Sequence, residues 1–327
     1  MDTVNNRSLP PELSTYSWRA IKPDDIPAIQ AMLAAASPVD RTEGGPTEAR
    51  LRALLGMLGD QVHKNTLLAL APDGSVAAMV FMIVPPAEDE RLAMFEGTVA
   101  VGHRGRGIGS FLLGRVEARA REEFSDAEGS LPRVIRTSCT GYQADRIRLF
   151  ERHGFEPMRY SYKMRRGLSE PVQKSPLPAG LSWVQWKPAL DPPLMDAFNE
   201  AFSEQWGLPR MNEDSWRTFF TGVPQFRSDL TYLAMDYEKI AGFCINWVEE
   251  ENEAKEGWIE AIGVSPSWRG RGIASAMLTY SLALFQGEGL LRAALDVDAQ
   301  NPTGALRLYE KHGFEVVKET IHFMKSL

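Results

Sequence analysis

The stretch GVSPSWRGRGIASAML, residues 263–278, decides the fold of this 327-residue chain. It leads from the end of a predicted strand, through an Arg-Gly-Arg-Gly loop, into a helix in which Ile273, Met277 and Tyr280 recur at helical spacing. A helix start offers unpaired N–H groups and a partial positive charge, and glycine lets the backbone approach a ligand closely. The stretch therefore predicts an anion site, and a pyrophosphate is the fitting ligand.

The same pattern occurs a second time, as GHRGRGIGSFL at 102–112. Downstream of each copy lies another matched pair, RLFERHGFE at 148–156 and RLYEKHGFE at 307–315. The two motifs keep their order in both halves, and the first half has a longer polar spacer between them. Ordered self-similarity of this kind predicts an internal duplication.

A Pro-, Ser- and Gly-rich segment without apolar periodicity separates the two copies. We therefore expect a loose arm at 1–14, an N-terminal domain at 15–166, a linker at 167–180 and a C-terminal domain at 181–327. The mixture of strand and helix periodicities predicts an α/β or α+β layer fold. In the second half we expect strands at 181–186, 230–235, 241–248, 258–264 and 292–297, helices near 190–203 and 212–221, a long helix after the loop, a helix at 302–312 and a strand pair from Phe314.

Composition narrows the class of protein. The net charge of −7 argues against nonspecific nucleic-acid binding. No apolar run approaches the roughly 18 residues of a membrane span, and the start of the chain lacks the apolar region of a signal peptide. Cys139 and Cys244 lie in strand-like runs of different halves, so they predict buried thiols in a reducing cytoplasm. His103, His153 and His312 lie in the repeat motifs without a second ligand at zinc-like spacing, which predicts no metal site.

The loop differs from other glycine-rich anion sites. A Rossmann loop reads G-x-G-x-x-G after the first strand of a parallel sheet, whereas this loop follows the fourth strand of its half. A P-loop needs Gly-Lys-Ser/Thr, which the sequence lacks. An RG-rich RNA-binding segment would be repetitive and disordered, whereas this one lies inside an ordered pattern. A tight strand–helix turn with exposed arginines remains the other interpretation of a single copy.

Both loops fit one signature, Arg/Gln-x-x-Gly-x-Gly/Ala. Its positions are Arg269, Gly272 and Ala274 in the second half, and Arg104, Gly107 and Gly109 in the first. The second half also fits the later motif N-x-x-A-x-x-L/I-Y-x-K-x-G-F, from Asn301 to Phe314. On these motifs both halves resemble the GNAT superfamily of acyl-CoA-dependent N-acyltransferases. The size and tandem layout are similar to those of the mycothiol synthases within it.

The resemblance implies two tandem GNAT-type domains, each a mixed central sheet with splayed strands flanked by helices. It implies acetyl-CoA as the acyl donor, with the pyrophosphate on the loop and the pantetheine arm along the preceding strand. The implied coenzyme A site of the second half comprises Ile262, Gly263, Val264, Arg269, Gly270, Arg271, Gly272, Ile273, Ala274 and Asn301. Its counterpart in the first half comprises Val99, Arg104, Gly105, Arg106, Gly107 and Gly109.

The resemblance further implies direct attack of an amine on the thioester, with Tyr309 protonating the leaving thiolate. Glu260 is a candidate base or water-orienting group, and a solvated carboxylate is its other interpretation. The first half carries Phe150 at the position of Tyr309, and strand counting places Phe95 at the position of Glu260. We therefore expect catalysis in the C-terminal domain and a degenerate N-terminal domain.

The acceptor site is less well marked. Glu204, Trp206 and Trp216 could form an acidic and aromatic wall for an amine, or the tryptophans could pack helices. We expect a small-molecule or peptide amine as the partner, no nucleic acid or membrane, and a monomer or homodimer. A mycothiol-precursor-like amine, a small pseudodisaccharide, is one candidate. The alternative function is a non-catalytic acyl-CoA-binding sensor or scaffold.

Overall fold

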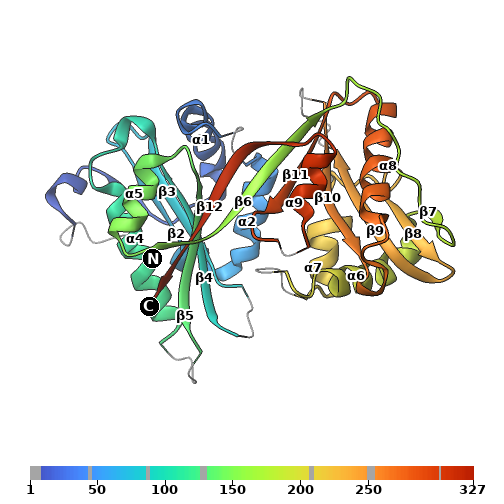
Figure 1. Ribbon diagram of the computed structural model, residues 1–327. Coiled ribbons are helices and arrows are strands. Elements are labelled where there is room, and N and C mark those ends of the chain that lie inside the picture. Colours follow the sequence, from blue (N-terminus) through green and yellow to red (C-terminus); the bar gives the residue numbers. More distant parts are fainter. Residues whose placement is uncertain are drawn as a thin grey trace. The chain divides into compact units, whose positions relative to one another are not determined.

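The structure is a computed structural model, and it describes residues 9–42, 46–85, 89–125, 131–205, 210–248, 255–301 and 303–327. The chain forms two compact units (Figure 1). The first comprises Met1–Tyr160 with Thr320–Leu327, and the second comprises Ser161–Glu319. The last residues of the chain therefore belong to the first unit. The domain boundaries expected from the linker follow the duplication along the sequence and stay a prediction.

The first unit contains a mixed sheet between two helical layers. Its strands follow the order β1 (Ser17–Arg19), β2 (Thr66–Leu70), β3 (Val76–Ile83), β4 (Arg91–Val99), β5 (Arg133–Thr140) and the Thr320–Ser326 part of β12 (Glu315–Ser326). β4 and β5 are parallel, and the other neighbours are antiparallel. Helices α1 (Ile26–Asp40) and α2 (Glu48–Leu58) pack on one apolar cluster, and α4 (Ile108–Glu123) and α5 (Ala144–Arg152) pack on another. The short α3 (Val62–Asn65) leads into β2.

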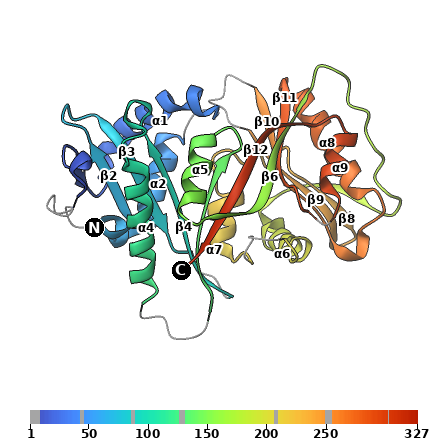
Figure 2. The same ribbon diagram turned by 60° about the vertical axis from the view of Figure 1, so that its left-hand side comes forward.

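The second unit repeats this plan. Its strands follow the order β7 (Ser182–Gln185), β8 (Tyr232–Asp236), β9 (Lys239–Val248), β10 (Glu256–Val264), β11 (Arg292–Asp298) and the Ser161–Gly167 part of β6 (Glu156–Gly167). Figures 1 and 2 show α8 (Ile273–Gly287) and α9 (Ala305–Lys311) on one side of these strands, and α6 (Asp191–Ala201) and α7 (Glu213–Trp216) on the other. The predicted mixed α/β architecture, with a sheet flanked by helices, is confirmed.

The parallel pair at the centre of each unit is short. β4 pairs with β5 only from Arg91 to Met94, and β10 pairs with β11 only from Glu256 to Trp258. Beyond these residues each strand continues toward its Arg-Gly loop without its parallel neighbour. This is the splay that the family resemblance implies, and it leaves one edge of β4 and of β10 available to other hydrogen-bonding groups.

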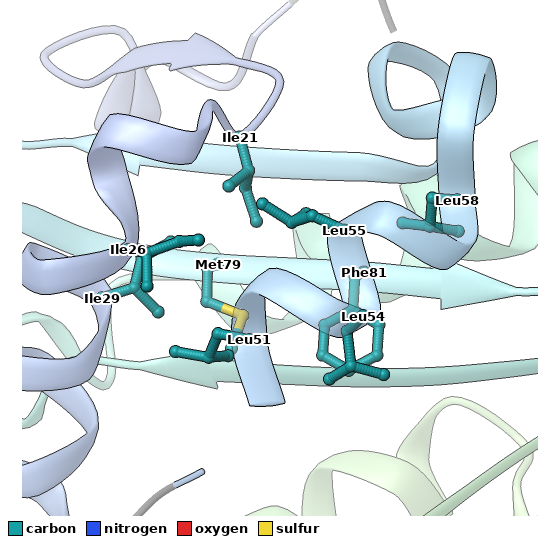
Figure 3. A pocket seen from close by; sticks show the side chains of 9 residues that line it. All are labelled: Ile21, Ile26, Ile29, Leu51, Leu54, Leu55, Leu58, Met79 and Phe81. Carbon is teal, nitrogen blue, oxygen red and sulfur yellow. The ribbon is translucent and has the colours of Figure 1, made fainter. Parts of the chain in front are cut away.

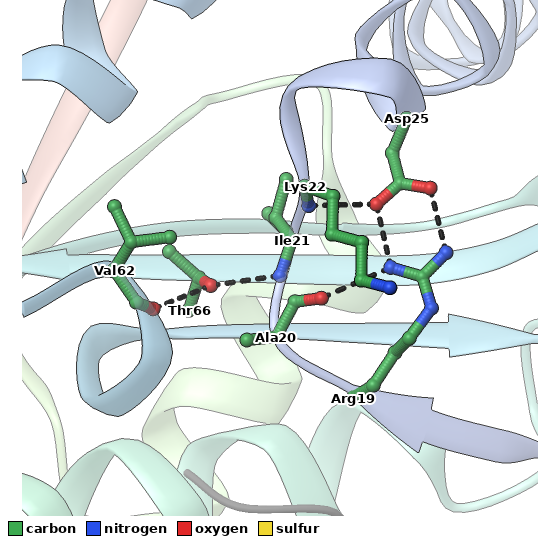
Figure 4. Close-up of polar contacts among 7 residues, drawn as sticks. All are labelled: Arg19, Ala20, Ile21, Lys22, Asp25, Val62 and Thr66. Carbon is green, nitrogen blue, oxygen red and sulfur yellow. Dashed lines mark hydrogen bonds and ion pairs between the residues drawn. The ribbon is translucent and has the colours of Figure 1, made fainter.

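A polar corner holds the entry into α1 (Figure 4). The Arg19 guanidinium donates to both carboxylate oxygens of Asp25 at 2.6 Å, and the Lys22 N–H donates to the same carboxylate at 2.7 Å. The Ile21 N–H donates to Thr66 Oγ1 at 2.9 Å. Because Pro23 begins the turn and offers no N–H, these side chains satisfy the neighbouring backbone groups.

A pocket of about 330 Å³, counting its open mouth, lies between the α1–α2 layer and β3 (Figure 3). Its lining is apolar and consists of Ile21, Ile26, Ile29, Leu51, Leu54, Leu55, Leu58, Met79 and Phe81. Sites for polar ligands combine apolar walls with a few convergent polar groups. This pocket offers no such side chain, so it is unsuited to an amine.

Candidate functional site

The two Arg-Gly loops have the same backbone shape. A 3-10 turn follows the strand in each copy, and a left-handed glycine precedes the helix, with φ of 81° at Gly107 and 85° at Gly272. A side chain at either glycine would meet open space, so conformation and not crowding requires glycine there. The starts of α4 and α8 therefore keep N–H groups accessible to an anion.

The first arginine of each loop braces the loop. Arg269 donates to the Ala201 carbonyl at the end of α6 at 3.0 Å, and its guanidinium lies 3.6 Å from Glu204. Arg104 forms a bidentate pair with Asp40 at the end of α1, with N–O distances of 2.8 and 2.7 Å. These side chains tie the first loop to the end of α1 and the second to the end of α6, which fixes the shape of the anion site.

The second arginine of each loop is exposed to solvent. Arg271 donates to the Ser267 carbonyl at 3.3 Å and lies over the ring of Trp268, 4.5 Å from its centroid. Arg106 donates to the Gly102 carbonyl at 3.1 Å. Of the two arginines in each loop, this one is the better placed to meet a phosphate with its charge.

The strand before the second loop packs on both faces. Ile262 and Val264 contact the cluster under α8 and α9, whereas Gly263 lies against Phe243 on the other face. An ideal Cβ at Gly263 would lie 2.1 Å from Phe243 Cζ, so only glycine fits there. Ile273 at the start of α8 is 1% exposed and anchors that helix in the core.

Glu260 lies at a β-bulge. The register of β10 against β9 shifts between Ile259 and Ala261, and Glu260 is the extra residue. Ile259 packs under α8, Ala261 packs on the α6 side, and Ile262 returns to the α8 side. The expected strict alternation of Glu260 with Ile262 is therefore interrupted, and sequence periodicity gave no sign of the bulge.

A network of polar contacts fixes the Glu260 carboxylate. The indole N–H of Trp258 donates to Glu260 Oε2 at 3.0 Å, and the Lys163 ammonium lies 4.8 Å from the Trp258 ring centroid. Lys163 also lies 3.5 Å from Glu256, which is 6% exposed and accepts from Arg165. Sequence reasoning missed this cluster because its basic members come from β6, far away in the sequence.

Tyr309 lies on α9 and is 9% exposed, with its ring 6.0 Å from that of Phe314. Burial raises the pKa of the Tyr309 phenol above its ordinary value, and the nearby Cys244 thiol adds to the effect. The same burial raises the pKa of Cys244 to about 12. Tyr309 is therefore a protonated phenol at neutral pH and can donate a hydrogen bond.

Two further side chains lie near the loop and α9. Ser275 Oγ, in the first turn of α8, lies 2.7 Å from His312 Nε2. Burial lowers the pKa of His312, and the charges of Lys311 and Arg166 act in the same direction. Asn301 accepts from the N–H of Thr303 at 2.9 Å and thereby shapes the turn before α9.

The family model described as the acetyltransferase (GNAT) family matches residues 29–155 and again 192–314. The chain belongs to the GNAT acetyltransferase family. It is a tandem GNAT protein and an acyltransferase, and the two matches confirm the predicted duplication.

Mycothiol acetyltransferases are among the relatives of this tandem GNAT protein. It is 27% identical over 306 residues to the mycothiol acetyltransferase of Geodermatophilus obscurus, covering 90% of this chain and 92% of that protein. It is 31% identical over 290 residues to that of Kineococcus radiotolerans, covering 87% and 88%. A solved GCN5-related N-acetyltransferase from Sphaerobacter thermophilus has a TM-score of 0.78 at 26% identity, covering 98% of this chain and 97% of that one. A tandem GNAT protein from the clavulanic acid biosynthesis pathway shares the fold, with a TM-score of 0.69 at 13% identity, covering 95% of this chain and 98% of that one.

The first GNAT unit differs from the second at the position of Tyr309. Phe150 is 2% exposed, and its ring centroid lies 6.1 Å from Phe95, 5.8 Å from Phe155 and 5.3 Å from Phe323. A ring in an aromatic core replaces the phenol, and it has no proton to donate.

The bulge changes the expected match at Glu260. Phe95 and Ile259 both pack in the cluster under the helices that follow the loops, so these two residues correspond. Glu96, which is exposed, then corresponds to the bulge position that Glu260 occupies in the second unit. The match of Glu260 with Phe95 is therefore off by one residue, and the first GNAT unit keeps a carboxylate at this position.

Two of the candidate acceptor residues, Glu204 and Trp216, are described, and they make different contacts. Glu204 is exposed beside Arg269. Trp216 is 2% exposed, stacks on Phe220 at 4.7 Å and donates to Asp191 at 2.9 Å, which fits the helix-packing interpretation. Trp206 and the acidic run at 249–253 lie outside the described residues.

Within the ranges given above, no three side chains of His, Cys, Asp or Glu come together as a set that could hold a metal ion. No helix in the same ranges has the length and apolar character needed to cross a membrane.

Proposed function

We propose that the second GNAT unit transfers an acetyl group from acetyl-CoA to an amine by direct attack. One observation carries the proposal: beside an open anion loop and a splayed strand, the second unit has the phenol of Tyr309 where the first has Phe150. The pyrophosphate would lie on the start of α8 near Arg271. The pantetheine arm would follow the free edge of β10 at Ile262 and Val264, toward Tyr309.

In the proposed reaction the amine nitrogen attacks the thioester carbonyl carbon, the C–S bond breaks, and the nitrogen loses a proton. An unperturbed glutamate carboxyl has a pKa of about 4.3 and a lysine-type amine about 10.4, so direct transfer between such groups is uphill by roughly 8 kcal/mol. A less basic amine, near pKa 8, reduces that cost to about 5 kcal/mol. We therefore assign Glu260 the role of orienting a water.

For Tyr309 the question is whether the phenol can give up its proton. Its raised pKa lies above the value of about 8.5 for an ordinary thiol, so complete proton transfer from the phenol to a thiolate is uphill. A hydrogen bond from the phenol to the developing thiolate requires no such transfer and grows stronger as charge appears on sulfur. We therefore propose that Tyr309 stabilises the departing thiolate as a donor and that the proton released by the amine restores neutrality.

The names of the relatives support one acceptor class. Mycothiol acetyltransferases match most of the chain, so the pseudodisaccharide amine that precedes mycothiol is the first acceptor to test. Lys163, Arg165 and Glu256 near the splay give the second unit charged groups that suit a polar acceptor. Cys139 and Cys244 are free, which supports action in the cytoplasm. The oligomeric state, monomer or homodimer, stays a prediction.

The test is thiol release from acetyl-CoA over a panel of amines that includes the mycothiol precursor, with mass spectrometry of the product. On the substrate found, Tyr309→Phe should lower kcat by about 10²-fold or more, the range for a positioned acid–base group, while coenzyme A binding is kept. The matched control is Tyr142→Phe, an exposed phenol of the first unit, which should turn over as the parent does. Unchanged turnover in Tyr309→Phe would remove the assignment. Absence of acetyl transfer to every amine would favour the binding-only alternative.

A further inference from the structure

The free edge of β4 in the first unit is already occupied by side chains of the same unit. The Phe95 carbonyl accepts from Thr137 Oγ1 at 3.0 Å, and the Gly97 carbonyl accepts from Arg146 Nη2 at 2.8 Å. The Val99 carbonyl accepts from Arg104 Nε at 3.1 Å. Because alternate carbonyls of a strand point to the same edge, these three donors cover one continuous edge of β4 beyond its parallel pairing.

Arg146 is held firmly in this position. Its guanidinium lies 5.5 Å from the Phe150 ring centroid, within the distance of a cation–π contact. Burial lowers the pKa of Arg146, and the thiol of Cys139 and the carboxylates of Glu96 and Asp40 act against that shift. The charge of Arg104 acts in the same direction as burial, so the net pKa is lowered, but an arginine guanidinium stays protonated in proteins. A charged guanidinium therefore lies at the place where the strands separate.

Arg104 is equally fixed, since its other nitrogens bind both oxygens of Asp40. Thr137 is 6% exposed and donates from β5 itself, across the gap where β4 and β5 no longer pair. The three donors thus come from three different elements and converge on one strand edge.

The second unit lacks these donors. Ala305 stands at the position of Arg146 in the matched helix motif, and it has no donor. Leu295 stands at the position of Thr137 in the matching strand, since it alternates with Ala293 and Val297 in the cluster of the second unit as Thr137 alternates with residues of the first cluster. The Leu295 side chain has no donor either. Arg269 is turned toward the Ala201 carbonyl. Among the residues that the structure describes, no side chain donates to the carbonyl of Ile262 or Val264.

We infer that Arg146 is a built-in occupant of the first unit's strand edge, which excludes the amide-bearing pantetheine arm of coenzyme A from that unit. The inference rests on the proposed function, in which the equivalent edge of β10 receives that arm. Arg146 thereby determines which of the two copies takes the thioester, although both keep the anion loop.

The test is calorimetric titration of the full chain with coenzyme A, which counts sites without requiring turnover. The parent protein should bind at one site per chain. Arg146→Ala, which copies the residue of the second unit, should bind at two sites. Arg146→Met keeps an apolar stem over Phe150 and removes every donor, so it should also bind at two sites and serves if the alanine variant unfolds.

Arg148→Ala is the matched control, because Arg148 lies on the same helix, is exposed and pairs only locally with Asp145. It should bind at one site. Two sites in the parent, or one site in the parent and in both folded Arg146 variants, would overturn the inference. The same titration can be done in a Gly272→Tyr background, which strains the second loop. There the protein that keeps Arg146 should bind coenzyme A at no site, and the protein with Arg146→Met should bind it at one site. A different outcome would count against the proposed function alone. In it, the protein without the Gly272 change binds coenzyme A at no site, and changing Arg146 adds one site.

Discussion

At the scale of single residues, the contact between Trp258 and Glu260 is a positioning contact that a substitution can isolate. Trp258→Phe keeps a large ring beside Lys163 and removes the N–H that holds the carboxylate. A hydrogen bond to a charged group contributes about 1.5–3 kcal/mol, so kcat/KM should fall by roughly 10- to 100-fold.

Trp247→Phe is the control for this prediction. Trp247 is the cross-strand neighbour of Trp258, and its buried indole N–H has no partner among the described residues. Its removal should leave kcat/KM unchanged. An equal loss in the two variants would show that ring packing, and not the bond to Glu260, sets the rate.

Tyr309 gives a second prediction at this scale. An ordinary phenol ionises near pH 10, but burial raises the pKa of Tyr309, so it keeps its proton through that pH. kcat measured from pH 7 to 10 on a good substrate should therefore show no decline centred near 10. A decline there that disappears in the residual activity of Tyr309→Phe would mean that the phenol titrates normally and is more exposed to water during turnover.

At the scale of elements, the corner between β1 and α1 links the stability of the first unit to pH. Burial alone would raise the pKa of Asp25, but the hydrogen bonds from Arg19 and the Lys22 N–H lower it overall. A depressed carboxylate pKa stabilises the folded state at pH above the unfolded value, about 3.9, and this stabilisation is lost as pH falls through the folded value. Asp25→Asn should therefore cost about 1–3 kcal/mol of unfolding free energy at pH 7 and much less near pH 3.

Urea unfolding of the first unit at the two pH values measures this difference. Asp24→Asn is the control, because Asp24 is the exposed neighbour, and it should change stability little at either pH. An Asp25→Asn penalty of the same size at pH 7 and pH 3 would show that the carboxylate charge does not contribute.

The elements themselves could be predicted where local pattern determines them. The Arg-Gly loop, the helix after it and the strand before it follow from glycine placement and apolar spacing. The bulge at Glu260 could not, because it depends on how β10 pairs with β9 and leaves the burial alternation of β10 almost intact. For the same reason the correspondence of Phe95 with Ile259 required the structure.

At the scale of the whole molecule, the duplication could be predicted from the sequence, but the composition of the units could not. Repeated motifs mark two copies along the chain, whereas the two compact units divide between Tyr160 and Ser161, ahead of the predicted linker at 167–180. Nothing local marks β12 as completing the sheet of the first unit, because strand pairing across nearly the whole chain leaves no periodic signal. The closure of the first strand edge by Arg146 is likewise a long-range contact with β4.

The return of β12 makes the first unit depend on the end of the chain. Thr320–Ser326 pairs with β5, and Ile321 and Phe323 contribute to the core that contains Phe150. Phe323 is 1% exposed, and removing a buried Phe side chain typically costs about 3–5 kcal/mol, so Phe323→Ala should destabilise the first unit. Limited proteolysis with mass spectrometry should find early cuts confined to residues 9–160, with the second unit resistant. Val316→Ala, at a side chain that is 47% exposed on the same strand, should digest as the parent does. Early cuts spread evenly over both units would mean that the two unfold together, and that the segment stabilises the whole chain and not the first unit in particular.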